Sequence, residues 1–116
     1  MQVEVWSDVV CPWCYIGKRR LERAIAELGD GTEVEVIWRS FQLDPSFPAG
    51  IQQPVHEYLA EKYRTTIAQA RAMTDRTTAL AAQEGLPFDT ERARMVNTFD
   101  AHRLIQLAKR HGRGAQ

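Results

Sequence analysis

The sequence predicts an α/β fold in which a βαβ unit is followed by a mostly helical stretch. Residues 2–6 and 33–39 alternate apolar and polar side chains, which is typical of half-buried strands. Between them, residues 12–28 carry apolar side chains at helical spacing, and Gly29 marks the end of that helix. A strand, a helix and a strand over about 40 residues indicate a parallel pair with a right-handed crossover.

Composition limits the classes of function to consider. The chain has 116 residues, 44% of them apolar and 26% charged, as in an ordinary soluble domain. A formal net charge of +0 gives no electrostatic reason to expect binding to nucleic acid or to a membrane. No apolar run approaches the roughly 18 residues of a spanning helix, and no secretion signal precedes the first strand. The expected location is therefore the cytoplasm.

The rest of the chain reads as a loop and several helices. Two domains are expected: residues 1–45 as the βαβ unit and residues 46–116 as a helical insert, within an incomplete domain. The expected elements after the second strand are a loop at 40–53, helices at 54–64 and 66–84, a short helical piece at 90–96, and a last helix ending at residue 111.

Both cysteines of the chain, Cys11 and Cys14, lie at the start of the first helix. Pro12 suits the first helical position, which places Cys11 at the N-cap. There the free backbone N–H groups and the helix dipole favour a thiolate, so we expect the pKa of Cys11 to lie below its ordinary value of about 8.5. The sequence thus predicts a redox centre in which Cys11 is the nucleophile and Cys14 the resolving thiol.

Three other interpretations of the pair are weaker. A structural disulfide would close a very short loop, and the entropic gain from a cross-link grows with loop length. A zinc site needs four ligands, and the chain offers no second cysteine pair and no histidine pair at finger spacing, so no metal is expected. Two unrelated buried cysteines would not explain the proline and tryptophan between them.

Three residues near the pair are candidate tuning or substrate-binding residues. Pro12 shapes the helix start. Trp13 either lies exposed over the active site or packs as an ordinary aromatic residue. Asp8, three residues before Cys11, is interpreted first as an ordinary acidic residue of the turn. The alternative is that it influences the ionisation of the thiols. His56 and His111 are expected on the surface.

Three stretches, in order, resemble the DsbA-like branch of the thioredoxin superfamily, and more closely its cytoplasmic FrnE-type oxidoreductases. They are Asp8 with the sequence CPWCYIG at 11–17, FQLDP at 41–45, and NTFDAHRL at 97–104. The resemblance implies a thioredoxin domain interrupted by a helical insert, in which Cys11 attacks and Cys14 resolves. It implies dithiol or disulfide proteins, or small thiols, as substrates. It also implies no cofactor beyond the cysteine pair, with glutathione as a candidate co-substrate. His102 falls in the third stretch and is a candidate tuning residue, with packing as the alternative.

The resemblance also implies that the C-terminal half of the thioredoxin domain is absent. That family continues into two further strands and a final helix, entered through a cis-proline loop. None of Pro45, Pro48, Pro54 or Pro87 stands in that context. We therefore expect a fragment, completed by a missing C-terminal segment or by another chain.

Two further classes of function stay open. One is a glutathione-dependent isomerase or transferase, because the related hydroxychromene-carboxylate isomerase branch shares the fold, although that branch tends to lack the resolving cysteine. A non-enzymatic thiol-containing binding module is the other alternative.

Overall fold

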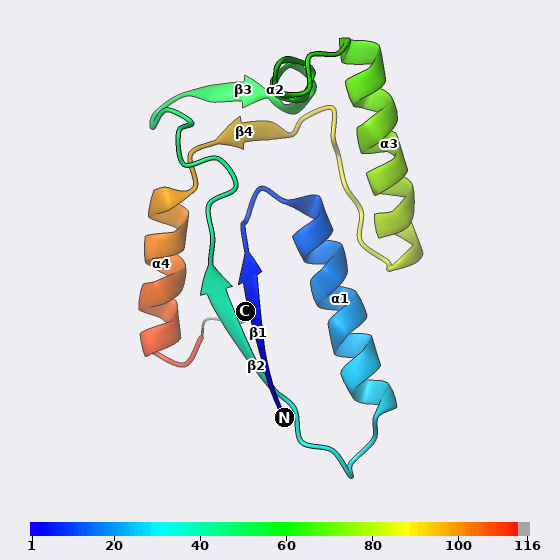
Figure 1. Cartoon of the computed structure of the whole chain (residues 1–116), viewed down its shortest axis with the longest axis vertical. Helices are drawn as coiled ribbons and strands as arrows, with labels where there is room; N and C mark the ends of the chain where they lie inside the picture. The colour runs from blue at the N-terminus through cyan, green and yellow to red at the C-terminus, as the bar shows by residue number, and fades with distance from the viewer. Residues whose placement is uncertain (114–116) are drawn as a thin grey trace. The chain divides into compact units, whose positions relative to one another are not determined.

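The computed structural model describes residues 1–113 of the chain and divides into two compact units (Figure 1). The first unit comprises Met1–Ser46 together with the chain from Thr98 onward. The second unit comprises Phe47–Asn97. The chain therefore leaves the first unit once and returns to it.

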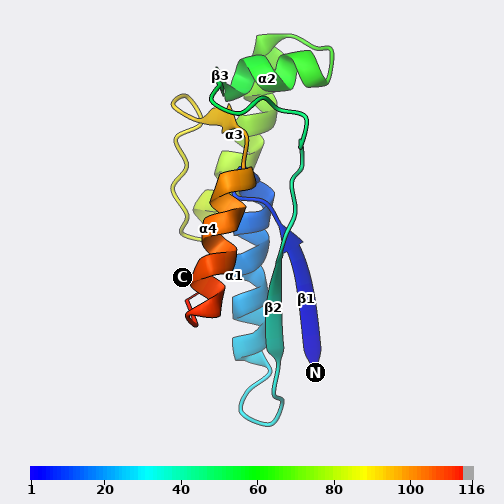
Figure 2. The same cartoon turned by 90° about the vertical axis from the view of Figure 1, so that its left-hand side faces the viewer.

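The first unit is a βαβ motif with one added helix. It contains β1 (Gln2–Ser7), α1 (Pro12–Glu27), β2 (Glu35–Ser40) and α4 (Phe99–Arg110). β1 and β2 pair in parallel, as predicted, and the half-buried residues Val3 and Val5 lie opposite Val36 and Trp38. Figure 1 shows the two strands between α1 and α4, and Figure 2 shows the same elements from the side of α4.

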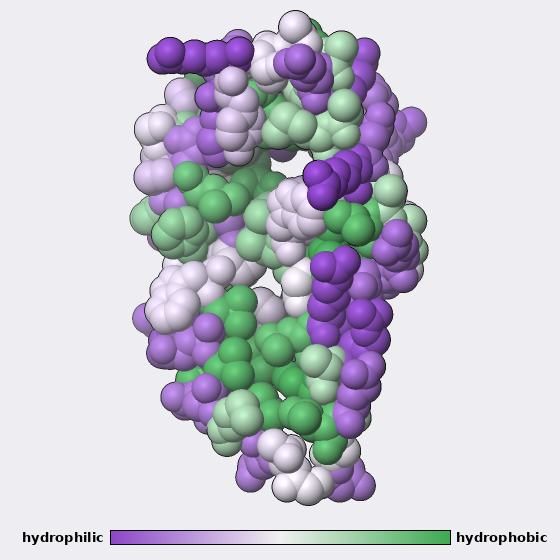
Figure 3. All heavy atoms as spheres, turned by 45° about the vertical axis from the view of Figure 1, so that its right-hand side comes forward, coloured by the Kyte–Doolittle hydropathy of each residue, from purple (hydrophilic) through white to green (hydrophobic). Residues whose placement is uncertain are grey.

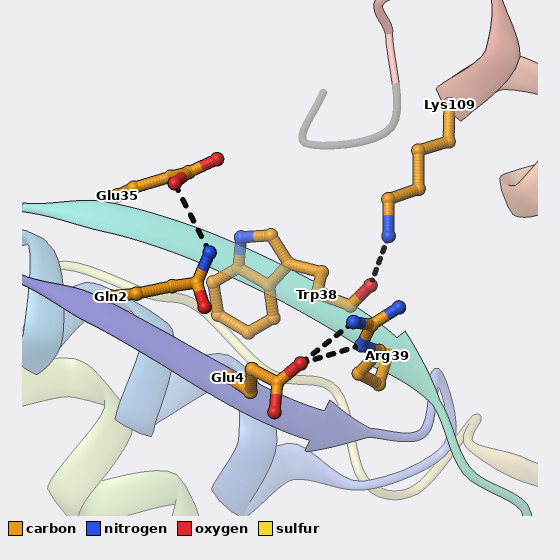
Figure 4. Close-up of polar contacts among 6 residues, drawn as sticks. All are labelled: Gln2, Glu4, Glu35, Trp38, Arg39 and Lys109. Atoms are coloured by element: carbon orange, nitrogen blue, oxygen red, sulfur yellow. Dashed lines mark hydrogen bonds and ion pairs between the residues drawn. The ribbon is translucent and has the colours of Figure 1, made fainter.

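The other face of this sheet carries polar contacts between the strands. Paired residues of parallel strands point to the same side, so polar side chains of β1 and β2 meet there. Arg39 Nη2 lies 2.7 Å from Glu4 Oε1, and Gln2 Nε2 donates to Glu35 Oε2 at 3.3 Å (Figure 4). α4 is joined to β2 by a hydrogen bond of 2.8 Å from Lys109 Nζ to the Trp38 carbonyl (Figure 4).

The second unit is a pair of helices with a short two-stranded sheet. α2 (Val55–Lys62) and α3 (Ile67–Gln83) bury small side chains, Ala60, Ala70 and Ala81. Thr66 caps α3, since its hydroxyl accepts a hydrogen bond from the Gln69 amide at 3.1 Å. β3 (Gln52–Pro54) and β4 (Arg94–Val96) pair antiparallel.

The expectation of a short helical piece at 90–96 was wrong, because Arg94–Val96 is strand β4. Its partner, β3, lies about 40 residues earlier, where residues 52 and 53 were expected to be loop and Pro54 was expected to begin a helix. Strand pairs as short as these carry no clear alternation of their own, so the pairing partner decides the structure.

The division of the chain also differs from the expected one. Residues 46–116 were expected to form the insert, but α4 groups with the first unit. It is joined there by His102, which bonds to Asp8, and by Lys109, which bonds to β2. Residues 114–116 of the expected insert lie outside the described residues. Between residues 1 and 113, no helix is both long enough and apolar enough to cross a membrane.

Candidate functional site

Cys11 and Cys14 lie in the first turn of α1, as predicted. Cys11 is the N-cap, with extended backbone angles (φ −99°, ψ 106°), and Pro12 opens the helix. The Cys14 amide donates a hydrogen bond of 3.1 Å to the Cys11 carbonyl, which closes this first turn. Both thiols are free and half-buried. The local sequence is enough to produce this arrangement, because proline at the first position fixes where the helix begins.

The expected lowering of the Cys11 pKa was wrong. Burial, followed by the neighbouring Cys14 thiol, raises the pKa of the Cys11 thiol to about 11. The backbone N–H groups of Cys14 and Trp13 act in the opposite direction, as the helix start should, but they do not outweigh the loss of solvent. The sequence shows where the helix starts but not how deeply the thiol is buried, and for this reason the direction of the pKa shift was predicted wrongly.

Asp8 lies at the centre of a buried polar cluster beside the cysteines. Its side chain is only 1% exposed. Oδ1 accepts hydrogen bonds from the Val9 amide at 2.8 Å and from His102 Nε2 at 2.9 Å, and Oδ2 accepts one from the Leu43 amide at 2.9 Å. The Asp8 carbonyl accepts a hydrogen bond of 3.3 Å from the Cys11 amide. Asp8 thus joins the end of β1, the segment after β2, and α4.

The surroundings of the pair are partly apolar and accessible. Trp13, between the two cysteines, is 49% exposed, and Val9 in the preceding turn is 54% exposed. Phe41 and Leu43 are exposed as well, and both belong to the segment that bonds to β1 and Asp8 through its backbone. Pro12 is half-buried at the helix start. The first unit therefore exposes Val9 and Trp13 next to the thiols in sequence, and Phe41 and Leu43 on the segment that is hydrogen-bonded to β1 and Asp8.

The hydrogen bond between Asp8 and His102 was not predicted from the sequence. Both residues were singled out, but separately, since 94 positions lie between them. Leu43 was missed as part of the cluster because it contributes only its backbone amide, and no side-chain pattern signals such a bond. The stretch FQLDP at 41–45 was the available signal.

The other two histidines differ in burial. The expectation that His56 lies on the surface was wrong: it is buried, and its Nε2 lies 2.8 Å from Thr74 Oγ1, linking α2 to α3. His111 is exposed, as expected. Within the described part of the chain, no group of three or more His, Cys, Asp and Glu side chains is placed to hold a metal ion.

Two proteins, one of them with a solved structure, are similar to this chain. The crystal structure of "probable DsbA oxidoreductase SCO1869" from Streptomyces coelicolor matches with a TM-score of 0.92 at 47% sequence identity. The match covers 98% of this chain and 49% of that one. The "Uncharacterized protein YwbO" of Bacillus subtilis is 42% identical over 57 residues, which are 49% of this chain and 26% of YwbO. The chain thus spans about half the length of SCO1869.

The family comparison extends over nearly the whole chain. The model of the DSBA-like thioredoxin domain matches residues 2–116. This range includes the βαβ motif, the cysteine pair at the start of α1, and α4 with His102. On this match, and on the likeness of fold to SCO1869, the chain belongs to the DsbA-like thioredoxin domain family.

Proposed function

We propose that this chain is a thiol–disulfide oxidoreductase that exchanges disulfides through Cys11 as the attacking thiol and Cys14 as the resolving thiol. The observation that carries the proposal is the placement of two free thiols in the first turn of α1, with one at the N-cap. Residues at i and i+3 of a first helical turn are within reach of a disulfide. Membership of the DsbA-like family and the likeness to SCO1869 support the same class of reaction.

In the reducing direction, the Cys11 sulfur attacks one sulfur of a substrate disulfide. A bond forms between Cys11 and that sulfur, the substrate S–S bond breaks, and the other substrate sulfur leaves as a thiolate that takes up a proton. Cys14 then gives up its proton and attacks Cys11, which forms the Cys11–Cys14 disulfide and releases the second substrate thiol. Two electrons pass from the dithiol to the substrate. The oxidising direction reverses each step.

The raised pKa of Cys11 shapes the first step. A thiol with a pKa of about 11 is almost entirely protonated at neutral pH, so its proton must be lost as the attack begins. The small thiolate fraction that does form is more nucleophilic than a low-pKa thiolate. A stabilised thiolate would lower the free energy of the reduced, dithiol form. Because Cys11 lacks that stabilisation, the reduced form is not favoured in this way. This favours donation of electrons over the strongly oxidising behaviour of a stabilised thiolate.

Trp13 and Pro12 have supporting roles in this proposal. Trp13 is 49% exposed between the two thiols, so a substrate that reaches Cys11 meets its indole ring. Pro12 fixes the start of α1 and therefore the position of both sulfurs. The stretches at 11–17, 41–45 and 97–104 are the basis for proposing the FrnE-type branch of the family and, with it, a cytoplasmic location.

The test is to trap the intermediate with Cys14→Ser and glutathione disulfide. Without the resolving thiol, the mixed disulfide on Cys11 cannot be released by the protein itself. We expect intact-mass measurement to show one glutathionyl group on Cys14→Ser, removable by dithiothreitol. The parent chain should instead end as the internal disulfide.

Cys11→Ser is the matched control, because it keeps Cys14 and alters only the attacking thiol. It should form the adduct far more slowly than Cys14→Ser. Equal rates of adduct formation on the two variants would contradict the assigned roles. A glutathione-dependent isomerase would turn over a test substrate without Cys14, and a binding module would keep its partner with both cysteines replaced.

We also propose that further DsbA-like chain, in the same polypeptide or in another, covers the first unit. In the described residues β1 pairs with β2 alone, so its outer edge carries unpaired backbone groups. Figure 3 shows hydrophobic atoms gathered in the lower half of that view, in the part of the chain that holds β1 and α1. Two strands with one apolar face are rarely stable without further cover.

This second proposal is tested on the 13.2 kDa chain by native mass measurement and thermal melting. We expect either self-association or a broad transition with binding of a hydrophobic dye, because the open edge and apolar surface remain accessible. A stable monomer of 13.2 kDa with one cooperative transition would contradict it.

A further inference from the structure

The Asp8 carboxylate links the cysteine turn to α4. Asp8 and His102 are both buried, with side chains 1% and 9% exposed. A carboxylate in such a place needs hydrogen-bond donors, since burial without them carries a large free-energy penalty. Asp8 receives two of its three from backbone amides, of Val9 and Leu43, and the remaining one from the His102 ring.

The geometry also indicates which ring nitrogen carries a proton. An ionised carboxylate only accepts hydrogen bonds, so the Nε2 atom that lies 2.9 Å from Asp8 is the donor. The other nitrogen, Nδ1, is buried and has no hydrogen-bond partner among residues 1–113. A proton there would be a buried donor without an acceptor, so the arrangement favours the neutral ring protonated on Nε2.

The same aspartate holds Cys11 through its backbone. Its carbonyl accepts the Cys11 amide at 3.3 Å, across the turn formed by Val9 and Val10. The side chain of Asp8 therefore fixes one end of the turn, and the N-cap cysteine is the other end. The contact that joins Asp8 to Cys11 is therefore one of backbone position.

We propose that Asp8 and His102 form a positioning pair that holds Cys11 against Cys14 and thereby favours the disulfide over the dithiol. The inference rests on the proposed function of the two cysteines as a redox pair. A disulfide requires a narrow range of Cα–Cα and Cβ–Cβ distances. An anchored Cys11 spends more of its time in that range, which raises the effective concentration of one thiol at the other.

The proposal predicts a coupling between the pair and the redox state. By linkage, a contact that favours the disulfide must stabilise the oxidised fold more than the reduced fold. A contact that only supports the fold would stabilise both forms equally, and its loss would leave the redox equilibrium unchanged. The redox equilibrium therefore separates a positioning role from a merely structural one.

The measurement is the equilibrium with a glutathione buffer, on the full chain. In this reaction Cys11 and Cys14 lose two electrons and two protons and form one S–S bond, while one glutathione disulfide is reduced to two glutathione molecules. His102→Leu removes the donor to Asp8. We expect its equilibrium constant for disulfide formation to fall about fivefold, at the lower end of usual coupling strengths. For a two-electron couple this is a rise in reduction potential of about 20 mV.

Two further variants make the test specific. His102→Gln keeps an N–H donor near the position of Nε2 and should return the constant to within about twofold of the parent. Lys109→Met is the matched control, because it removes another bond from α4 to the sheet, to the Trp38 carbonyl, without touching Asp8. It should lower the melting temperatures of both redox forms equally and leave the constant unchanged.

The outcomes separate the claims. Equal constants for the parent and His102→Leu, with both redox forms melting earlier, would overturn the positioning role while the proposed function stands. If His102→Leu does not fold, Asp8→Asn decides in its place, since it keeps the size and removes the carboxylate. An unchanged constant for a folded Asp8→Asn would overturn the role in the same way. A parent chain that does not exchange with glutathione would overturn both proposals.

Discussion

The two units of the chain treat their apolar side chains differently. In the second unit several apolar residues are buried: Phe47, Ala60, Ala70, Ala81, Leu86 and Met95. In the described part of the first unit, Ile16 is the single apolar residue in that class, at 1% exposure. Large apolar residues that are exposed there are Met1, Trp6, Val9, Trp13, Tyr15, Leu28, Phe41, Leu43, Phe99, Leu104 and Leu107.

In the described part of the first unit the buried side chains are mostly polar and surround the reactive turn, whereas the second unit buries apolar side chains as well as the polar His56, Thr74 and Thr77. Counted as whole residues, Asp8, Thr98 and His102 are at most 7% exposed, and the His102 amide also donates a hydrogen bond of 3.0 Å to the Thr98 carbonyl. Directional bonds fix positions accurately but add little net stability, whereas apolar burial adds more and specifies position less. The contrast thus indicates that the unit with the thiols fixes positions more than it buries apolar surface, which is in keeping with the proposal that further chain covers it.

The largest expected effect is on the free energy of unfolding, and it tests the contrast between the units by truncating one leucine in each. Leu86 in the second unit is 2% exposed, and Leu104 on α4 in the first unit is 66% exposed. Leu86→Ala should lower the free energy of unfolding by about 2–5 kcal/mol, because it removes buried methyl groups and leaves a cavity. Leu104→Ala should change it by about 0.5 kcal/mol or less. Urea denaturation followed by circular dichroism measures both.

Tryptophan fluorescence sharpens the result, because Trp6, Trp13 and Trp38 all lie in the first unit. If Leu86→Ala shifts the circular dichroism transition more than the fluorescence transition, the two units unfold separately. A loss from Leu104→Ala as large as that from Leu86→Ala would show that the first unit already buries this surface in solution, and the contrast between the units would fail.

Much of the first unit could be predicted because its signals are local. The alternation at 2–6 and the helical spacing after Pro12 each need only a few neighbouring residues to be recognised. Glycine is also informative there: Gly29 ends α1 with φ +74°, a conformation that other residues rarely adopt. The register of β1 and β2 agrees with this alternation, because it places Val3 and Val5 opposite Val36 and Trp38.

What could not be predicted depends on residues far apart in the sequence. β3 and β4 each have three residues, so they exist only as partners of one another. The Asp8–His102 bond needs the return of the chain to the first unit, which no local pattern specifies. The predicted direction of the Cys11 pKa shift was wrong for the same reason. The helix start is specified by local sequence, but the burial that raises the pKa is set by the whole fold.

A smaller effect concerns the thiol, and it should be confined to the first unit. Burial and the Cys14 thiol raise the pKa of Cys11 from 9.0 to about 11 in the folded, reduced chain. Below pH 9 both folded and unfolded chains keep this proton, so it does not affect stability. As pH rises from about 9 to about 11, the unfolded chain releases the proton first, and the folded state loses stability. The loss should be about 1 kcal/mol or less, because solvent screens a half-exposed group.

Urea denaturation of the reduced chain across this pH range, followed by tryptophan fluorescence, measures the loss. Cys11→Ser and the oxidised parent both lack the titrating thiol and should show a shallower pH dependence, and this difference isolates Cys11 from lysine and tyrosine titration. Alkylation of Cys11 in the folded chain should keep accelerating up to about pH 11, in line with its raised pKa. A rate that levels off near neutral pH would mean that the helix start outweighs burial after all. The thiol environment would then be governed by the local sequence at the start of α1.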